Sequence, residues 1–165
     1  MRTPLLRLLA VTTATVPAAV VLACGGKSPT DATPTANTVM FGNATATVAI
    51  ASTKAAREHG LMNVTQLAAD SGMLFVFGYM SNGRAFWMKN TPIPLAIAFL
   101  DSTKKVVYLA EMAANDTIAR YGGFNAPRMQ YALEMNKGWF TAHGVTIGSV
   151  AAFTLPSGLV IETDP

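Results

Sequence analysis

The stretch GMLFVFGYMSNGRAFWMKNTPIPLAIAFLD, residues 72–101, decides the fold of this chain. Two apolar runs of strand length, residues 73–77 and 95–100, flank a dense polar and aromatic segment, residues 86–91. Within that segment Lys89 and Asn90 lie among aromatic and apolar residues. Burial of an unpaired charge costs a large free energy, so these polar groups must find partners inside the fold or line a depression. The stretch therefore predicts two core strands and indicates where to look for a site.

Outward from this stretch, the sequence predicts further short strands. Residues 45–51 alternate between apolar and polar, as a half-buried strand does. Thr53 and Gly60 are suitable start and end residues for a helix over 54–59. Strands are also expected at 85–89, 106–112 and 128–135, helices at 64–69 and 137–143, and a final hairpin at 150–155 and 159–162. This spacing predicts a mainly β fold: a compact antiparallel sandwich or distorted barrel with two or three short helices.

The first residues have the pattern of an export signal. Arg2 and Arg7 supply positive charge, and the apolar run that follows ends in VLAC, residues 21–24. This ending resembles a bacterial lipobox, which implies cleavage before Cys24 and attachment of fatty-acyl groups such as palmitate. We expect a signal peptide at 1–23, a flexible tether at 24–37 and one β domain at 38–165. The alternative is an uncleaved anchor, or an ordinary secretory signal with an incidental cysteine.

This reading predicts a lipoprotein of the bacterial cell envelope that faces the periplasm or the exterior. Its partners would be the membrane, reached through lipidated Cys24, and an unknown small ligand or envelope protein. Without Arg2 and Arg7, ten basic residues stand against nine acidic ones and form no polybasic run. Neither nucleic acid nor an anionic lipid surface is therefore expected as an electrostatic partner.

The residue inventory argues against cofactor and metal chemistry. Cys24 is the only cysteine, which excludes disulfides, thiol catalysis and cysteine-based metal centres. The methionines form no compact array and occur mostly in apolar runs, where they are ordinary core residues. His59 and His143 each precede a glycine expected to end a helix, where capping is the simpler role. We therefore expect neither a cofactor nor a metal.

Several motifs in order resemble one family. They are REHGLM at 57–62, GMLFVF at 72–77, FWMKNTPIPL at 86–95, AFLD at 98–101, LEMNKG at 133–138 and GVTIGSV at 144–150. Together they resemble the domain-of-unknown-function 192 family, DUF192, also called UPF0127. The resemblance implies a compact mainly β fold, frequent export in bacteria and archaea, and no established general activity. Two positions depart from the family pattern, because Ala96 and Ser149 stand where the family commonly has Asp.

The motifs also contain the candidate site, which we place at Trp87, Lys89, Asn90, Thr91, Glu134 and Asn136. In a regular strand Trp87 and Lys89 would share one face, and so would Glu134 and Asn136. Such a cluster could bind an anion, a carbonyl or a hydroxylated ligand against an aromatic wall. The structural alternative is that Lys89 pairs with Glu134 while Asn90 and Thr91 bond the proline turn.

Three functions remain open from the sequence. The leading interpretation is a binding or accessory module with this polar and aromatic site. An enzyme would need Lys89 and Glu134 in one pocket, with Glu134 as acid or base and Lys89 as electrostatic stabiliser. A protein-interaction domain would instead present a contiguous apolar patch.

Overall fold

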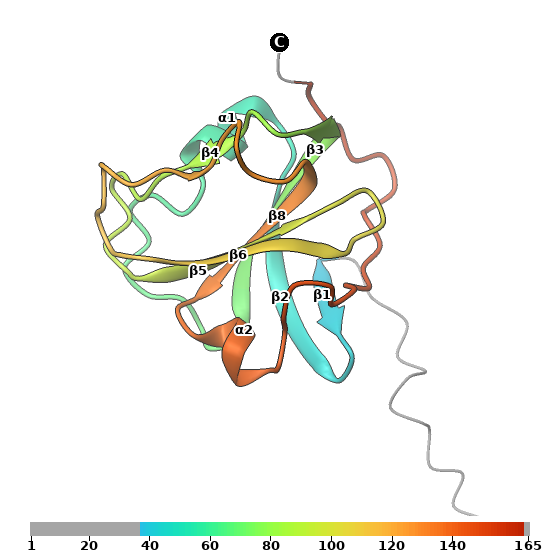
Figure 1. Ribbon diagram of the computed structural model, residues 1–165, viewed down its shortest axis with the longest axis horizontal. Helices are drawn as coiled ribbons and strands as arrows, with labels where there is room; N and C mark the ends of the chain where they lie inside the picture. Colours follow the sequence, from blue (N-terminus) through green and yellow to red (C-terminus); the bar gives the residue numbers. More distant parts are fainter. Residues whose placement is uncertain (1–36, 164–165) are drawn as a thin grey trace, which may run out of the picture.

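The computed structural model describes residues 37–163 of the 165-residue chain. Two sheets and two short helices make up this part (Figure 1). The strands are β1 Thr38–Phe41, β2 Ala44–Ala51, β3 Ser71–Ser81, β4 Ala85–Phe86, β5 Leu95–Leu100, β6 Val106–Met112, β7 Tyr121–Gly122 and β8 Met129–Asn136, and the helices are α1 Lys54–His59 and α2 Trp139–Ala142. The mainly β fold expected from the sequence is confirmed. The expected signal peptide, the lipidation at Cys24 and nearly all of the tether lie outside the described residues.

The larger sheet has six strands in the order β1-β2-β3-β8-β5-β6, and β4 pairs with β7 in a separate small sheet. All pairings are antiparallel except that of β2 with β3, which is parallel. A parallel pair needs a crossover connection, and α1 lies in this one. The described strands form a mixed, sandwich-like fold and no closed barrel.

Both faces of the six-stranded sheet carry a hydrophobic core. On β5, the side chains of Ala96, Ala98 and Leu100 belong to one cluster, and those of Leu95, Ile97 and Phe99 belong to the other. Successive strand residues point to opposite faces, so a strand buried on both sides reads as a continuous apolar run. Within the described part, the residues of both clusters lie between 39 and 161.

Different segments cover the two faces. Trp139 and Phe140 of α2 pack in the first cluster together with Ala151 and Phe153 of the C-terminal segment. The second cluster contains Leu61 after α1 and Met88 after β4, and Ile93 packs against it. This second face carries a pocket, which lies between α1 and the β4 segment.

Helix α1 has the expected boundaries for the expected reasons. The Thr53 hydroxyl accepts a hydrogen bond from the Ala56 amide at 3.2 Å, which satisfies one of the unpaired donors of the first turn. Gly60 ends the helix with a φ of +52°, a value that glycine adopts without strain. Among the described residues no helix is long and apolar enough to cross a membrane.

Three expectations about elements are wrong. Residues 64–69 form no helix, the strand expected at 85–89 ends at Phe86, and residues 150–162 form no hairpin. Ala152 instead makes an isolated bridge to Met40, and the Glu162 carboxylate accepts a hydrogen bond from the Lys54 amide at 2.6 Å. Partners distant in the sequence thus replace the local pairing. The domain also begins with a strand, β1, that was not expected.

Candidate functional site

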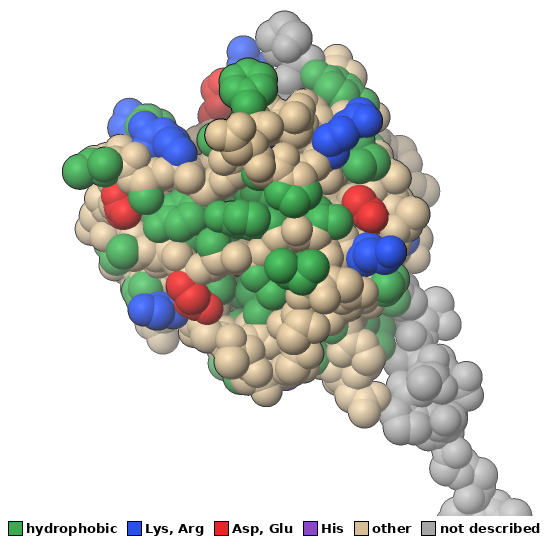
Figure 2. Space-filling model, in the orientation of Figure 1, with side chains coloured by type: hydrophobic (Ala, Val, Ile, Leu, Met, Phe, Trp, Pro, Cys, Tyr) green, Lys and Arg blue, Asp and Glu red, His purple; other side chains and the backbone are tan. Residues whose placement is uncertain are grey.

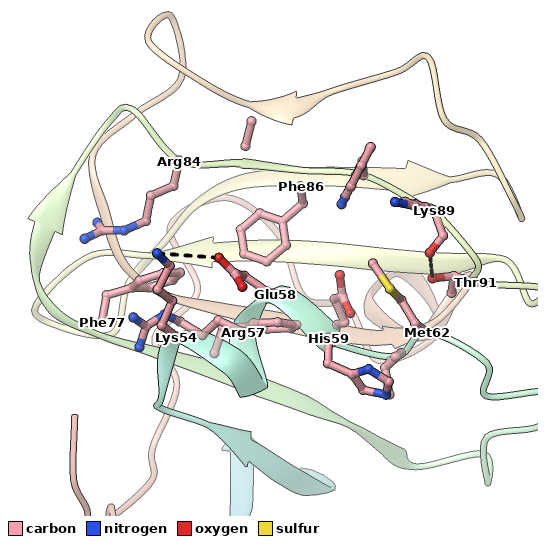
Figure 3. A pocket seen from close by; sticks show the side chains of 16 residues that line it. Lys54, Arg57, Glu58, His59, Met62, Phe77, Arg84, Phe86, Lys89 and Thr91 are labelled. Carbon is pink, nitrogen blue, oxygen red and sulfur yellow. Dashed lines mark hydrogen bonds and ion pairs between the residues drawn. The ribbon is translucent and has the colours of Figure 1, made fainter. Parts of the chain in front are cut away.

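The second face of the sheet carries a pocket of about 760 Å³. Its walls come from α1 with residues 60–62 on one side and from residues 84–91 on the other, and β3 and β8 supply its floor. Figure 3 shows Glu58 and Phe86 facing each other across it, with Lys89 and Thr91 at one end and Arg84 at the other. The lining residues are Lys54, Arg57, Glu58, His59, Gly60, Leu61, Met62, Phe75, Phe77, Arg84, Ala85, Phe86, Trp87, Lys89, Thr91 and Glu134.

Glu134 is the buried acidic group of this pocket. It lies in the middle of the sheet, opposite Met73 of β3 and Ile97 of β5. Only 4% of Glu134 is exposed, and no hydrogen bond joins its carboxylate to another group of residues 37–163. No fully buried side-chain oxygen of these residues is without a partner, so the oxygens of Glu134 border the open pocket. Desolvation by burial raises the pKa of Glu134 to about 8. At pH 7 the side chain is therefore mainly a neutral acid that can donate a hydrogen bond.

The backbone beside Glu134 requires a glycine. A Cβ on Gly72 of β3 would overlap the Glu134 carbonyl oxygen and the Met135 sulfur. Because the carbonyl belongs to the paired backbone of β8, it cannot move aside as a flexible side chain can. Gly72 thus allows β3 and β8 to approach closely where Glu134 enters the pocket.

Lys89 supplies a positive charge to the same pocket. It follows β4 in an irregular segment, and its Nζ lies 5.1 Å from the centre of the Trp87 ring. Within residues 37–163 its ammonium has no carboxylate partner and makes no hydrogen bond. Trp87 is the neighbour of Lys89, as the sequence predicted, although the strand assumed for that argument ends at Phe86 and includes neither residue.

Trp87 also contacts a second cation. The Arg120 guanidinium lies 4.8 Å from its ring centre, and Arg120 is held by carbonyls of its own loop, including Thr117 O at 2.9 Å. Two cations therefore contact the ring of one half-exposed tryptophan at the pocket edge. The Thr91 hydroxyl donates to the Lys89 carbonyl at 3.3 Å, so Thr91 supports the backbone that carries Lys89.

Four of the six expected site residues line the pocket: Trp87, Lys89, Thr91 and Glu134. Asn90 does not. Its carbonyl accepts a hydrogen bond from the Asn63 amide at 2.7 Å, and its φ of +54° makes it a turn residue. Asn136 does not line it either, because its amide nitrogen donates to the carbonyls of Leu67, Ala68 and Ala69. These two asparagines fix the loop over residues 61–70.

The sequence reasoning missed the contribution of α1. Arg57 stacks on Phe77 at 5.0 Å and donates to the carbonyls of Val76 and Glu162, while Arg84 stacks on the same ring at 4.1 Å from the other wall. Phe77 thus lies between two guanidinium groups. The motif at 57–62 could have suggested this contribution, because charged residues stand at the start of a family motif. Its spacing gave no sign that these residues share a pocket with Glu134 of β8.

Exposed charges add little specificity to the pocket. Lys54 and Glu58 form an i,i+4 ion pair at 3.9 Å with both side chains mostly in solvent, and such pairs stabilise by only about 0.3–0.5 kcal/mol. No group of three or more His, Cys, Asp and Glu side chains within residues 37–163 is arranged to hold a metal ion.

The two positions that depart from the family pattern lie away from the pocket. Ala96 is buried in the first cluster, on the opposite face of β5 from the pocket. Ser149 accepts a hydrogen bond from the Thr146 amide at 3.0 Å, in the loop after α2. Neither position supplies a side chain to the pocket wall.

Comparisons with known proteins agree with the motifs. Residues 37–153 match the DUF192 family, described as uncharacterized ACR. A solved structure from Sinorhizobium meliloti, of a protein described as a candidate transcription regulator, is 32% identical with a TM-score of 0.62, and the match covers 69% of this chain and 88% of that one. A protein of unknown function from Novosphingobium aromaticivorans is 25% identical, also with a TM-score of 0.62, over 78% of this chain and 100% of that one. No match was found among the curated proteins.

Proposed function

The chain belongs to the DUF192 family of uncharacterised proteins, and we propose that it is a binding module whose pocket takes a small organic anion with an apolar body. The observation that carries this proposal is that Lys89 and Glu134 line the same pocket. Among the described residues, Lys89 has no carboxylate partner and Glu134 receives no hydrogen bond. Both groups offer unused hydrogen-bonding capacity to a ligand.

The charges favour an anion. Lys89 is positive, and Glu134 is mainly neutral at pH 7, so the two groups together present hydrogen-bond donors without a compensating negative charge. A carboxylate or phosphate oxygen accepts from both kinds of donor, and bonds to a charged group contribute about 1.5–3 kcal/mol each. An uncharged analogue of the same shape would lose this contribution.

The walls favour an apolar body on the ligand. Phe75, Phe77 and Phe86 line the pocket together with Leu61 and Met62. Phe75 and Phe86 meet edge to face with ring centres 5.0 Å apart, so this wall is a packed surface. Small-molecule sites commonly combine such an apolar lining with a few polar groups that fix orientation.

The test uses probes of this chemistry. Phenylacetate, hexanoate and phenyl phosphate are compared with phenylacetamide and hexanamide by thermal shift and titration calorimetry at pH 6.5. At least one anion should raise the melting temperature, and its uncharged analogue should not. Lys89→Met should weaken binding about tenfold or more, whereas Lys137→Met, an exposed lysine outside the pocket, should leave it unchanged. Failure of every anion, or an equal response of the two variants, would overturn the proposal.

An enzyme is the second candidate, and one observation favours it. Glu134 and Lys89 line the same pocket, and a carboxyl with a pKa near 8 is suited to proton transfer near neutral pH. Glu134 would then act as acid or base and Lys89 as electrostatic stabiliser. Hydrolysis of chromogenic carboxylic esters and phosphate esters tests this candidate. Glu134→Gln should abolish a true activity while binding of the anionic probe persists. If the wild-type chain turns over none of these esters, the binding module is the better account.

The envelope location is part of the proposal. The sequence pattern that ends at Cys24 supports a protein held by lipid on the membrane, with the β domain beyond a short tether. Metabolic labelling with a palmitate analogue, followed by membrane fractionation, should label the wild-type chain and not Cys24→Ala. An unlabelled wild-type chain would contradict this part.

A further inference from the structure

We propose that the edge of the pocket formed by residues 82–91 and 113–128 docks on the surface of an anionic phospholipid bilayer. These two segments, here called the rim, are joined by the pairing of β4 with β7. Trp87 and Lys89 belong both to the rim and to the pocket wall, so docking would bring the pocket next to the lipid headgroups. The proposal does not depend on what the pocket binds.

The first observation is the exposure of large apolar side chains on the rim. Ile118 is 91% exposed and Phe124 is 83% exposed, on either side of β7, and Trp87 is 40% exposed. Single exposed apolar residues are ordinary, but a group of them on paired segments marks an interaction surface. Figure 2 shows hydrophobic and basic side chains next to each other on the edge of the molecule near β4.

The second observation is that the rim holds these side chains on an ordered backbone. The Asp116 carboxylate accepts hydrogen bonds from the amides of Ile118 and Ala119 at 2.9 and 3.0 Å. The Asn82 side chain donates to the Phe124 carbonyl at 3.2 Å. A surface fixed in this way loses less conformational entropy on docking than a mobile loop does.

The third observation is the distribution of charge. The rim carries four basic residues and one acidic residue, namely Arg84, Lys89, Arg120, Arg128 and Asp116. The other residues between 37 and 163 carry five basic and six acidic residues. The sequence has no polybasic run and did not indicate an anionic lipid surface, but the fold concentrates the positive charge of the described part at the rim, where it complements anionic lipid.

This combination favours a bilayer over nucleic acid. Phosphate groups of nucleic acid would use the cations, but Ile118 has no flat ring to stack on a base and would stay in water. At a bilayer the cations contact phosphates while Ile118 and Phe124 enter the boundary of the acyl chains. The Trp87 ring contacts the cations of Lys89 and Arg120. Such a tryptophan suits the interface between membrane and water, where tryptophan is enriched.

The test measures vesicle binding of the chain from Gly25 to Pro165, which lacks Cys24 and contains every residue of the two described core clusters. Vesicles of phosphatidylcholine are compared with vesicles that also contain phosphatidylglycerol, by flotation and tryptophan fluorescence. The wild-type chain should bind the anionic vesicles, and added salt should weaken binding. Ile118→Ser with Phe124→Ser should lower the partition coefficient about tenfold or more. Arg120→Gln with Arg128→Gln should lower it about tenfold.

Matched controls lie on other parts of the domain. Ile147→Ser with Val150→Ser removes two side chains that are 67% and 57% exposed, and Lys105→Gln with Lys137→Gln removes two exposed charges. Neither control should change vesicle binding, and circular dichroism should show each variant folded. Three results would overturn the proposal. Rim and control variants could lose binding equally, or the wild-type chain could show no preference for anionic vesicles. The third is that the rim variants abolish binding to an oligonucleotide while vesicle binding persists.

Discussion

At the residue scale, the site depends on one acid in an unusual environment. Glu134 occupies a position on β8 where its two chain neighbours, Leu133 and Met135, point into the opposite core. Its own side chain faces the pocket, and the described residues offer it no donor. A carboxyl without such a partner is more stable protonated, because the charged form loses its hydration without compensation.

This environment predicts how stability changes with pH. Burial raises the folded-state pKa of Glu134 to about 8, above the ordinary value of 4.5, so between these pH values the folded state holds a proton that the unfolded state releases. The contribution of Glu134 to stability is complete below pH 4.5 and is lost as the pH rises toward 8, by at most about 1.4 kcal/mol per pH unit. Urea unfolding at pH 5, 6, 7 and 8 measures this slope.

Glu134→Gln is the matched variant for this measurement, since it keeps the shape and the hydrogen-bonding capacity of the neutral acid. It should be close to wild type in stability at pH 5 and more stable than wild type at pH 8. Parallel pH profiles for the two proteins would show that Glu134 ionises in the folded state as it does in the unfolded chain.

At the element scale, the pocket wall depends on the short pairing of β4 with β7. Gly122 of β7 has a φ of +101°, and a Cβ there would lie 2.5 Å from the Arg84 carbonyl oxygen and 2.9 Å from the Phe99 ring. Gly123 has a φ of +91° but has nothing within 4 Å of its Cβ position. Both glycines have a positive φ, but only Gly122 has atoms close to its Cβ position. Comparing substitutions at the two positions therefore distinguishes the cost of backbone strain from the cost of steric overlap.

Alanine substitutions at these two glycines should differ. Gly123→Ala should cost only the strain of a positive φ, about 1 kcal/mol. Gly122→Ala should cost about 2–4 kcal/mol, because it also displaces β4 from β7. Chemical denaturation gives both values, and amide spectra should show changes around Arg84 only for Gly122→Ala. Similar costs for both variants would mean that the β4–β7 contact yields easily.

Asn136 makes a second prediction at this scale. Its side chain donates to the Ala68 carbonyl at 2.8 Å, and the same carbonyl accepts from the Ser71 amide at 2.9 Å, just where β3 begins. Asn136→Ala should lower the unfolding free energy by about 1–2 kcal/mol and speed hydrogen exchange at Ser71. Asn82→Ala, which removes one exposed hydrogen bond, should do neither. Unchanged exchange at Ser71 in Asn136→Ala would contradict the tethering role.

The elements also show what the sequence could and could not predict. The strands 95–100 and 106–112 and helix 54–59 were predicted with their observed bounds, because apolar runs, capping residues and turn residues are local signals. The helix predicted at 64–69 does not form, because the side chain of Asn136, distant in sequence, holds carbonyls of this segment in a loop. Contacts between distant residues also limit what could be predicted of the site. Lys89 and Glu134 could be chosen because they are polar residues within motifs. The contribution of α1 could not, because it depends on the crossover that joins the parallel strands β2 and β3.

At the scale of the whole molecule, the two faces of the sheet differ. One face is closed by α2 and the C-terminal segment, while the other carries the pocket between α1 and the β4 segment. The fully buried phenylalanines, Phe75 and Phe99, belong to the core under the pocket. Burial of each contributes about 1.5–3 kcal/mol, so the pocket rests on a well-packed floor. A rigid floor keeps Glu134 in place while the surface residues meet a ligand.

The most direct test of the central claim is the titration of the Glu134 side-chain carboxyl by carbon-detected nuclear magnetic resonance, with and without phenyl phosphate or the best-binding anion. Without ligand, burial predicts a pKa of about 8. A bound anion favours the protonated acid, so the pKa should rise further, and affinity should fall as the pH rises above 8. A pKa for Glu134 near 4.5, or one that the anion lowers or leaves unchanged, would contradict the account.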